Sequence, residues 1–242
     1  MIFEHPPALI GHRGAGSGPD ENTLASLLAA DAAGLPWVEI DVTRTADDDL
    51  VLRHDPTRAD GAYLSELTAA DSGLPRLAEI FEALPAHVGV DVDVKTILED
   101  AVDPPERRTG ELLLPVLRRE AARRPLLVTS FDPSLLLHLR DGLPGVPLGL
   151  LTWLRFPMWH AVPAAAGLGV QVVAVHTGSC GFDHPDTRLR PLEQCVEVAH
   201  KAGLEFVAWS PKPDRAPDYA AAGVDAMVID DVPGVLAALG RA

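Results

Sequence analysis

The sequence predicts an α/β fold, a TIM (β/α)8 barrel that forms a single domain. The chain of 242 residues contains a series of short runs rich in β-branched and aliphatic side chains, and helix-like segments lie between most of them. About eight strand–helix units in a chain of this length fit a closed barrel more readily than an open sheet. We therefore expect one domain over residues 1–242.

The predicted strands follow one another along the whole chain. They cover residues 9–14, 37–45, 88–95, 126–131, 147–152, 170–177, 205–210 and 226–230. Amphipathic or Ala-rich stretches predict helices at residues 23–33, 110–124, 133–139, 191–202 and 218–222.

Two places depart from this simple alternation. Residues 50–54 predict an extra short strand, and residues 56–84 predict a short insertion with small helices at 64–70 and 77–84. The Pro-rich stretch 103–108 predicts a loop.

Composition and charge narrow the classes of function. Hydrophobic residues make up 47% and charged residues 23% of the chain, which is typical of soluble globular proteins. The formal net charge of -15 repels phosphate backbones and anionic lipid surfaces, so we expect neither a nucleic-acid partner nor stable membrane association. An anionic small-molecule substrate would need a local positive centre, such as a metal ion with a few Arg or Lys side chains.

The cysteines and the N-terminal sequence indicate the cellular compartment to expect. Cys180 and Cys195 have no CxxC spacing, so neither a disulfide framework nor a zinc site is indicated. The N-terminal sequence lacks a basic stretch followed by a long apolar one, and no run approaches the length of a membrane span. We expect a cytoplasmic protein, and the sequence is silent on its oligomeric state.

Reactive side chains gather at the C-terminal ends of the predicted strands, where the active sites of TIM barrels lie. They are His12 and Arg13 at the end of the first strand, Glu39 and Asp41 in the second, His54 and Asp55 at the end of the extra strand, and Asp91, Asp93 and Lys95 in the third. Each of these residues alone is more typical of a solvated or packed position. Their combination at neighbouring strand ends favours a catalytic site.

Several of these carboxylates share one face of the barrel. Glu39 and Asp41 stand two positions apart in one strand, and Asp91 and Asp93 repeat this spacing in the next. Carboxylates on one inner face repel one another unless a cation lies between them. Oxygen ligands favour a hard divalent ion, Mg2+ or Ca2+. The histidines can give or take a proton near neutral pH.

The order and spacing of these motifs resemble those of the glycerophosphodiester phosphodiesterase family over nearly the whole chain. The matching motifs are Gly11-His12-Arg13-Gly14, Glu21-Asn22-Thr23, Glu39-Ile40-Asp41-Val42, His54-Asp55, Asp93-Val94-Lys95, Ser130-Phe131, Trp209 and Gly223-Val224-Asp225. The resemblance implies a TIM barrel that hydrolyses a glycerophosphodiester to glycerol 3-phosphate and an alcohol, with one Mg2+ or Ca2+ ion.

The resemblance also implies a role for each matching residue. It makes His12 and His54 the acid–base pair, Glu39, Asp41 and Asp93 the metal ligands, and Arg13, Lys95 and Trp209 the residues that bind phosphate and substrate. Asp93 stands where the family usually has Glu, which shortens the ligand arm by one methylene and bears on metal affinity. Residues 209–212 and Ile229 also differ from the family pattern.

Some questions stay open in the sequence. Residues 153–159 hold Trp153 and Trp159 on the active-site face, and they either pack against a helix or a second subunit, or line the pocket. His176 and His184 lie on the same face and are more typical of loop residues. A lysophospholipase D-like enzyme and a non-catalytic barrel that binds phosphorylated ligands are the alternative functions. Short, water-soluble substrates are preferred over acylated ones.

Overall fold

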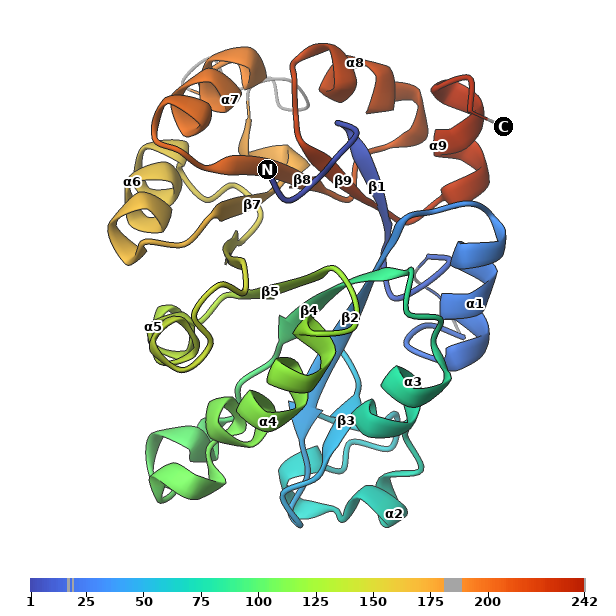
Figure 1. Cartoon of the computed structure of the whole chain (residues 1–242), viewed down its shortest axis with the longest axis vertical. Coiled ribbons are helices and arrows are strands. Elements are labelled where there is room, and N and C mark those ends of the chain that lie inside the picture. Colours follow the sequence, from blue (N-terminus) through green and yellow to red (C-terminus); the bar gives the residue numbers. More distant parts are fainter. Residues whose placement is uncertain (17, 19, 181–188, 242) are drawn as a thin grey trace.

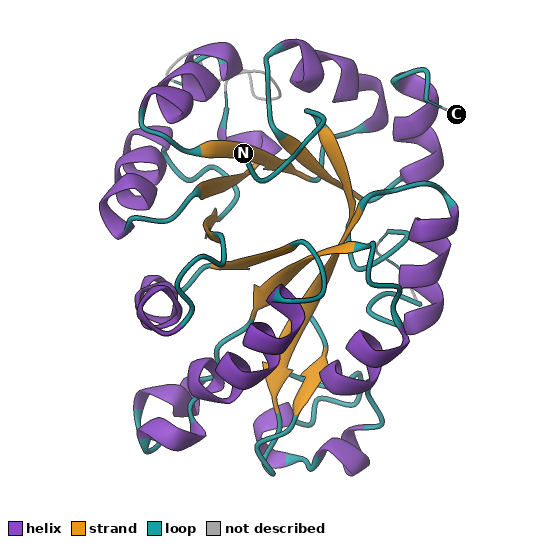
Figure 2. Cartoon of the chain, in the orientation of Figure 1, coloured by secondary structure: helices purple, strands orange, loops and turns teal. Residues whose placement is uncertain are grey.

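A computed structural model describes residues 1–16, 18, 20–180 and 189–241, and it confirms the TIM barrel. Nine strands form one sheet in the order β1-β9-β8-β7-β6-β5-β4-β2-β3, and an additional pairing of β1 with β2 closes it. Among the described residues, every barrel strand is parallel to its neighbours, and only β3 is antiparallel, at the edge of β2. Helices surround this barrel on the outside (Figure 1) and alternate with its strands (Figure 2).

The bounds of the elements follow the predicted order. The barrel strands are β1 (Ala8–Gly11), β2 (Trp37–Arg44), β4 (Gly89–Val94), β5 (Leu126–Ser130), β6 (Leu148–Thr152), β7 (Val172–His176), β8 (Glu205–Trp209) and β9 (Ala226–Ile229), with β3 at Leu50–Leu52. The α-helices are α1 (Leu24–Ala32), α2 (Ala69–Ser72), α3 (Leu77–Ala83), α4 (Thr109–Ala121), α5 (Pro133–Gly142), α6 (Met158–Leu168), α7 (Leu192–Lys201), α8 (Ala216–Ala221) and α9 (Val232–Ala238). Short 3-10 turns are η1 (Leu64–Glu66), η2 (Leu98–Ala101), η3 (Pro105–Arg107), η4 (Thr177–Ser179) and η5 (Pro213–Arg215).

The structure corrects the prediction at four places, one of which is helix α9, where no helix was predicted. The small helix predicted at residues 64–70 is wrong: the segment contains η1, and α2 begins only after Thr68, whose side chain accepts a hydrogen bond from the backbone of Asp71. The predicted loop at 103–108 contains the turn η3. Helix α6 begins inside the segment 153–159, and Pro163 within it obscures the helical pattern in the sequence.

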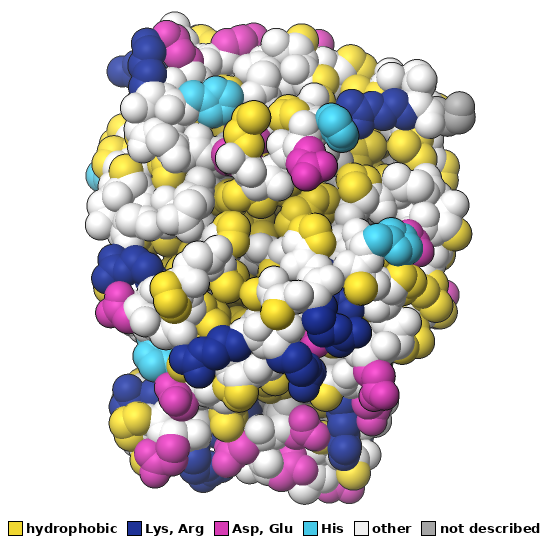
Figure 3. Space-filling model, in the orientation of Figure 1, with side chains coloured by type: hydrophobic (Ala, Val, Ile, Leu, Met, Phe, Trp, Pro, Cys, Tyr) yellow, Lys and Arg dark blue, Asp and Glu magenta, His cyan; other side chains and the backbone are white. Residues whose placement is uncertain are grey.

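Two apolar clusters separate the structural part of the barrel from its polar end. The larger cluster lies between the strands and the helices, and includes Leu27 of α1 and Phe206 of β8. The smaller one fills the barrel interior around Phe3, Ile10 and Trp37, where the Phe3 and Trp37 rings meet edge to face at 5.4 Å. Hydrophobic side chains accordingly gather over the barrel in Figure 3. This core leaves the C-terminal ends of the strands to polar residues.

A buried arginine fixes the segment that follows β4. Arg44, at the end of β2, is 2% exposed, and its guanidinium contacts Asp48 at 2.8 Å and also pairs with Asp103. A buried guanidinium needs such partners to offset its lost hydration. The contact ties the chain beyond Lys95 to the barrel. Within the part of the chain that the structure describes, no helix has the length and apolarity to cross a membrane.

Candidate active site

A cavity of about 270 Å³ opens at the C-terminal ends of the barrel strands. Most of the residues predicted for the site line it: His12, Arg13, Glu39, His54, Asp93, Lys95 and Trp209. The remaining one, Asp41, is 1% exposed and lies against Arg13 and Lys95 at the wall of this cavity. The structure therefore brings together every residue that the sequence singled out for the site.

Strand register explains why four carboxylates meet here. In the parallel pair β2–β4, Glu39 stands beside Asp91 and Asp41 beside Asp93. Side chains two positions apart on a strand point to the same face, so all four project into the barrel. Asp91 accepts a hydrogen bond from Thr129 Oγ1 at 2.9 Å. The other three carboxylates are left to form a group.

The group of Glu39, Asp41 and Asp93 fits a hard divalent cation. One ligand oxygen from each residue lies within 4.8 Å of the others, and all three side chains are buried. Among the described residues, neither Glu39 Oε1 nor Asp93 Oδ1 has a hydrogen-bond partner. Buried carboxylate oxygens without donors are costly, and an oxygen-only set of this size suits Mg2+ or Ca2+.

The electrostatics of the group are those of crowded, buried acids. Burial raises the pKa of Glu39 well above its usual value, and the nearby charges of Asp41 and Asp93 raise it further. Burial likewise raises the pKa of Asp93 to about 6, against the opposing effect of Lys95. Burial also opposes ionisation of Asp41, but Lys95 and Arg13 together lower its pKa below the usual value. A bound cation would favour the ionised form of all three.

Arg13 is placed by an unusual backbone turn. Its φ of 54° lies in the left-handed region, and the following Gly14 has a φ of 102°. A Cβ atom on Gly14 would lie 2.6 Å from the backbone of Ser26, so only glycine fits there. The turn directs the Arg13 backbone N–H to Glu39 Oε2 at 2.8 Å and its guanidinium to Asp41 Oδ2 at 3.1 Å. Arg13 thus braces two carboxylates of the group.

Asn22 is a site residue for which no role was predicted from the sequence. Its side-chain amide donates to Asp41 Oδ2 at 2.8 Å, and its carbonyl oxygen accepts from the Asp41 backbone N–H at 3.0 Å. These two bonds fix the Asp41 carboxylate. Its place in the Glu21-Asn22-Thr23 motif was the only sign in the sequence.

Each of the two histidines has a carboxylate at Nδ1. His12 Nδ1 lies 2.5 Å from Asp230 Oδ1, and His54 Nδ1 lies 2.8 Å from Asp55 Oδ1. An Nδ1 proton shared with a carboxylate leaves Nε2 available to a bound substrate. Asp230 was not predicted for the site, because it follows β9 and reaches His12 only through the β1–β9 pairing.

The opposite wall of the cavity is aromatic. Trp153 stacks on Phe131 with ring centroids 4.1 Å apart, and Trp209 meets Phe131 edge to face at 6.5 Å. The two tryptophans of segment 153–159 separate: Trp153 lines the cavity, whereas Trp159 lies on α6, away from its lining, and is 57% exposed.

His176, the other described histidine predicted for this face, does not line the cavity. His176 packs its ring against Trp209 and accepts a hydrogen bond from the Gly178 backbone at 2.9 Å, so it supports the aromatic wall. His184 lies outside the described residues.

Comparisons with known proteins agree with this geometry. A family model described as the glycerophosphoryl diester phosphodiesterase family matches residues 12–233. A glycerophosphodiester phosphodiesterase of Caldanaerobacter subterraneus subsp. tengcongensis is 24% identical over 92% of this chain and 93% of its own length.

Solved structures show the same fold. A putative glycerophosphoryl diester phosphodiesterase from Silicibacter pomeroyi superposes with a TM-score of 0.80 at 24% identity, and the match covers 98% of this chain and 95% of the other. A phosphodiesterase from Oleispira antarctica, solved in complex with the product sn-glycerol-3-phosphate, gives a TM-score of 0.79 at 22% identity and covers 97% of each chain.

Proposed function

Because this chain belongs to the glycerophosphoryl diester phosphodiesterase family, we propose that it hydrolyses glycerophosphodiesters to glycerol 3-phosphate and an alcohol. The observation that carries the proposal is one cavity that holds two histidines, a group of carboxylates and two cationic side chains. Phosphodiester hydrolysis needs both proton transfer and offset of negative charge, and these residues are suited to both tasks.

Metal binding in this proposal rests on Glu39, Asp41 and Asp93. A divalent ion held by them would polarise a phosphoryl oxygen and offset its charge. Arg13 and Lys95 line the same cavity and present further positive charge to the phosphate. Trp209 and the rest of the aromatic wall contact the organic part of the substrate.

Proton transfer in this proposal belongs to His12 and His54. With Nδ1 held by Asp230 and Asp55, each imidazole offers Nε2 to the substrate. One takes the proton of the attacking hydroxyl group, and the other gives a proton to the departing alcohol oxygen. The cavity suits either order of roles, and either water or the glycerol hydroxyl as the attacking group.

The alternatives draw on different features. The exposed face of Trp153, which is 64% accessible, offers apolar contact to an acyl chain and favours a lysophospholipase D-like activity as the second candidate. A non-catalytic barrel that only binds phosphorylated ligands would not need two histidines that are oriented by carboxylates and lie beside a group of candidate metal ligands. We retain short, water-soluble substrates as the first choice, with no nucleic-acid partner, no stable membrane association and a cytoplasmic location as further predictions.

A single assay tests the proposal. The purified protein is dialysed against EDTA, and release of glycerol 3-phosphate from glycerophosphocholine is measured with and without added Mg2+ or Ca2+. We expect turnover only after a metal is returned. Full activity in EDTA would remove the metal from the mechanism. Failure to release glycerol 3-phosphate from any of a panel of glycerophosphodiesters, with either metal, would leave the lysophospholipase D-like enzyme and the binding protein as candidates.

A further inference from the structure

We propose that Lys95 is an internal counter-ion that competes with the divalent metal for its ligands and is released to the phosphate when the metal binds. This inference rests on the proposed function and concerns the order in which charges are exchanged in the site. It makes metal affinity and phosphate affinity depend on one another through a single side chain.

The contacts of Lys95 carry the inference. Its ammonium pairs with Asp93 Oδ2 and lies 3.0 Å from Asp41 Oδ1, so it bridges two of the three candidate ligands. The side chain is 17% exposed and reaches these atoms from inside the cavity. A divalent ion bound by the same carboxylates would compete with the Lys95 ammonium for Asp41 Oδ1 and share Asp93 with it.

The carboxylate oxygens without hydrogen bonds show which ligand atoms a metal could use without competing with Lys95. Glu39 Oε1 and Asp93 Oδ1 have no hydrogen-bond partner among the described residues. Asp41 Oδ1 also lacks a hydrogen bond within the described part of the chain, but it lies 3.0 Å from the Lys95 ammonium. Asn22 and Arg13 both contact the other oxygen, Oδ2. The Asp41 oxygen that is left for a metal is Oδ1, the one beside Lys95. Complete ligation by all three residues therefore displaces the ammonium from Asp41.

The cavity provides a destination for the displaced ammonium. Lys95 Nζ lies 5.3 Å from the centroid of the Phe131 ring, at the boundary between the carboxylate group and the aromatic wall. A lysine has a flexible stem and three donors, so it can turn to a phosphate in the same cavity. Arg13 is less able to do this, because Glu21 and Asp41 hold its guanidinium at 2.9 and 3.1 Å.

Thermodynamic linkage turns this exchange into a measurable coupling. A phosphate that attracts Lys95 removes a competitor of the metal, and by reciprocity a bound metal increases the affinity for phosphate. Direct contact between metal and phosphate would also couple the two. The contribution of Lys95 can be distinguished from this direct contact by measuring how its removal changes metal affinity in the absence of phosphate. If Lys95 served only the phosphate, its removal would leave that affinity unchanged.

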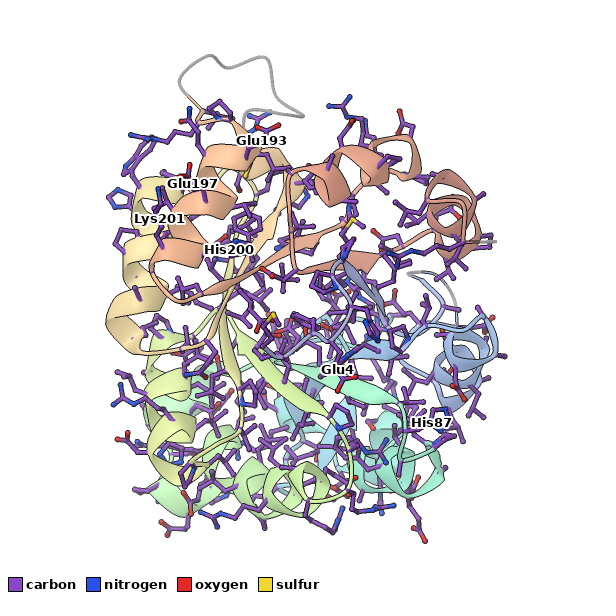
Figure 4. The ribbon with its side chains drawn as sticks, turned by 45° about the horizontal axis from the view of Figure 1, so that its top comes forward. Glu4, His87, Glu193, Glu197, His200 and Lys201 are labelled. Carbon is purple, nitrogen blue, oxygen red and sulfur yellow. The ribbon has the colours of Figure 1, made fainter. Side chains whose placement is uncertain are left out.

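The test measures Ca2+ and Mg2+ binding by calorimetry on the chelated protein, with and without glycerol 3-phosphate. We expect Lys95→Met to bind the metal alone about tenfold more tightly than the wild type or better, since close charge pairs couple strongly. Glycerol 3-phosphate should then enhance metal binding less in this variant than in the wild type. Lys201→Met is the matched control, because this substitution removes the same charge at a distance from the site. Lys201 lies on the outer side of α7 beside Glu197 (Figure 4).

The outcomes separate this inference from the proposed function. Unchanged or weaker metal binding by Lys95→Met, with the wild type binding normally, would overturn the counter-ion role and leave the proposed function standing. A wild type that binds neither metal, even with glycerol 3-phosphate, would overturn both. Circular dichroism checks the fold. If Lys95→Met does not fold, Lys95→Gln, which keeps a polar group beside the carboxylates, replaces it. We expect the same increase in metal affinity from this second variant.

Discussion

The two candidate acid–base residues share one local arrangement at different depths. His12 is confined between Asp230 and Glu39, whose Oε2 lies 3.9 Å from its Nε2. His54 has Asp55 at Nδ1, and its side chain is 41% exposed. In both cases a carboxylate orients the ring and stabilises the tautomer with a free Nε2. Removal of either imidazole therefore removes a group that is already oriented for proton transfer.

We predict that His12→Ala and His54→Ala each lower kcat by about 100-fold or more, the usual scale for the loss of an acid–base group. The measurement is glycerol 3-phosphate release at saturating metal, with circular dichroism as the check on folding. His87→Ala is the control, because His87 is 72% exposed and pairs with Asp31 outside the cavity. A loss of only a few-fold in both site variants would assign proton transfer to another group.

Asp93 carries the departure from the family pattern that bears most directly on the metal. Its carboxylate lines the cavity, so an added methylene can extend toward open space instead of into the core. We predict that Asp93→Glu binds Ca2+ more tightly, on the order of several-fold, because the longer arm reaches the ion with less adjustment by the barrel. Calorimetry gives the affinity, and Asp141→Glu, the same change at a carboxylate that is 73% exposed and lies outside the cavity lining, should have no effect. Equal affinity in Asp93→Glu and the wild type would show that the shorter arm is not limiting.

At the scale of elements, the segment between β6 and α6 divides its two tryptophans between different tasks. Trp153 precedes the helix and completes the aromatic wall with Phe131. Trp159 lies within the first turn of α6, where its ring centroid is 6.0 Å from that of His160. The two residues are thus a natural pair for comparison, because both are exposed aromatic side chains of one segment and only one lines the cavity.

We predict that Trp153→Ala lowers kcat/KM for glycerophosphocholine by about tenfold, the scale of a lost aromatic contact, while Trp159→Ala leaves it unchanged. The wild type should prefer glycerophosphocholine to lysophosphatidylcholine, assayed below its critical micelle concentration. A value at least about tenfold higher for the acylated substrate would favour the lysophospholipase D-like function, since each buried methylene contributes roughly 0.8 kcal/mol. Loss of that preference in Trp153→Ala would locate the acyl chain on the aromatic wall.

Strand-level patterns made most of the fold and the site predictable. Glu39, Asp41 and Asp93 could be assigned to one face because alternation along a strand is local. The contact between His12 and Asp230 could not, because it joins the first and last strands and exists only after the barrel closes. Lys95 illustrates another limit. Its nearness to the phosphate is implied by the family resemblance, but its pairing with Asp93 and Asp41 depends on side-chain geometry.

The whole molecule combines a formal charge of -15 with a barrel mouth that buries further acidic groups. Burial raises the pKa of Asp91 to about 8, although the hydrogen bond from Thr129 opposes the shift. The same effect raises the pKa of Asp93 to about 6. Ionisation of these buried carboxyls therefore costs stability as the pH rises through their folded pKa values. The stability of the metal-free protein should therefore depend on pH in a range where most carboxylates no longer titrate.

Asp91→Asn isolates this effect. The folded pKa of about 8 lies above the value of about 3.9 for an unfolded chain, so between them the folded protein holds a proton that the unfolded chain releases. The contribution of this carboxyl is therefore fully present at low pH and is lost as pH rises to 8, at about 1.4 kcal/mol per pH unit. We predict that, in EDTA between pH 6 and 8, the free energy of unfolding of the wild type falls more steeply with pH than that of Asp91→Asn, by roughly this amount. Asparagine keeps the acceptor for Thr129 and cannot ionise, and both proteins share the same histidines, so their difference reports Asp91 together with its effect on neighbouring acids such as Glu39. Urea titrations at several pH values give the two slopes, and parallel slopes would contradict the prediction by showing that Asp91 is ionised in the folded protein throughout this range.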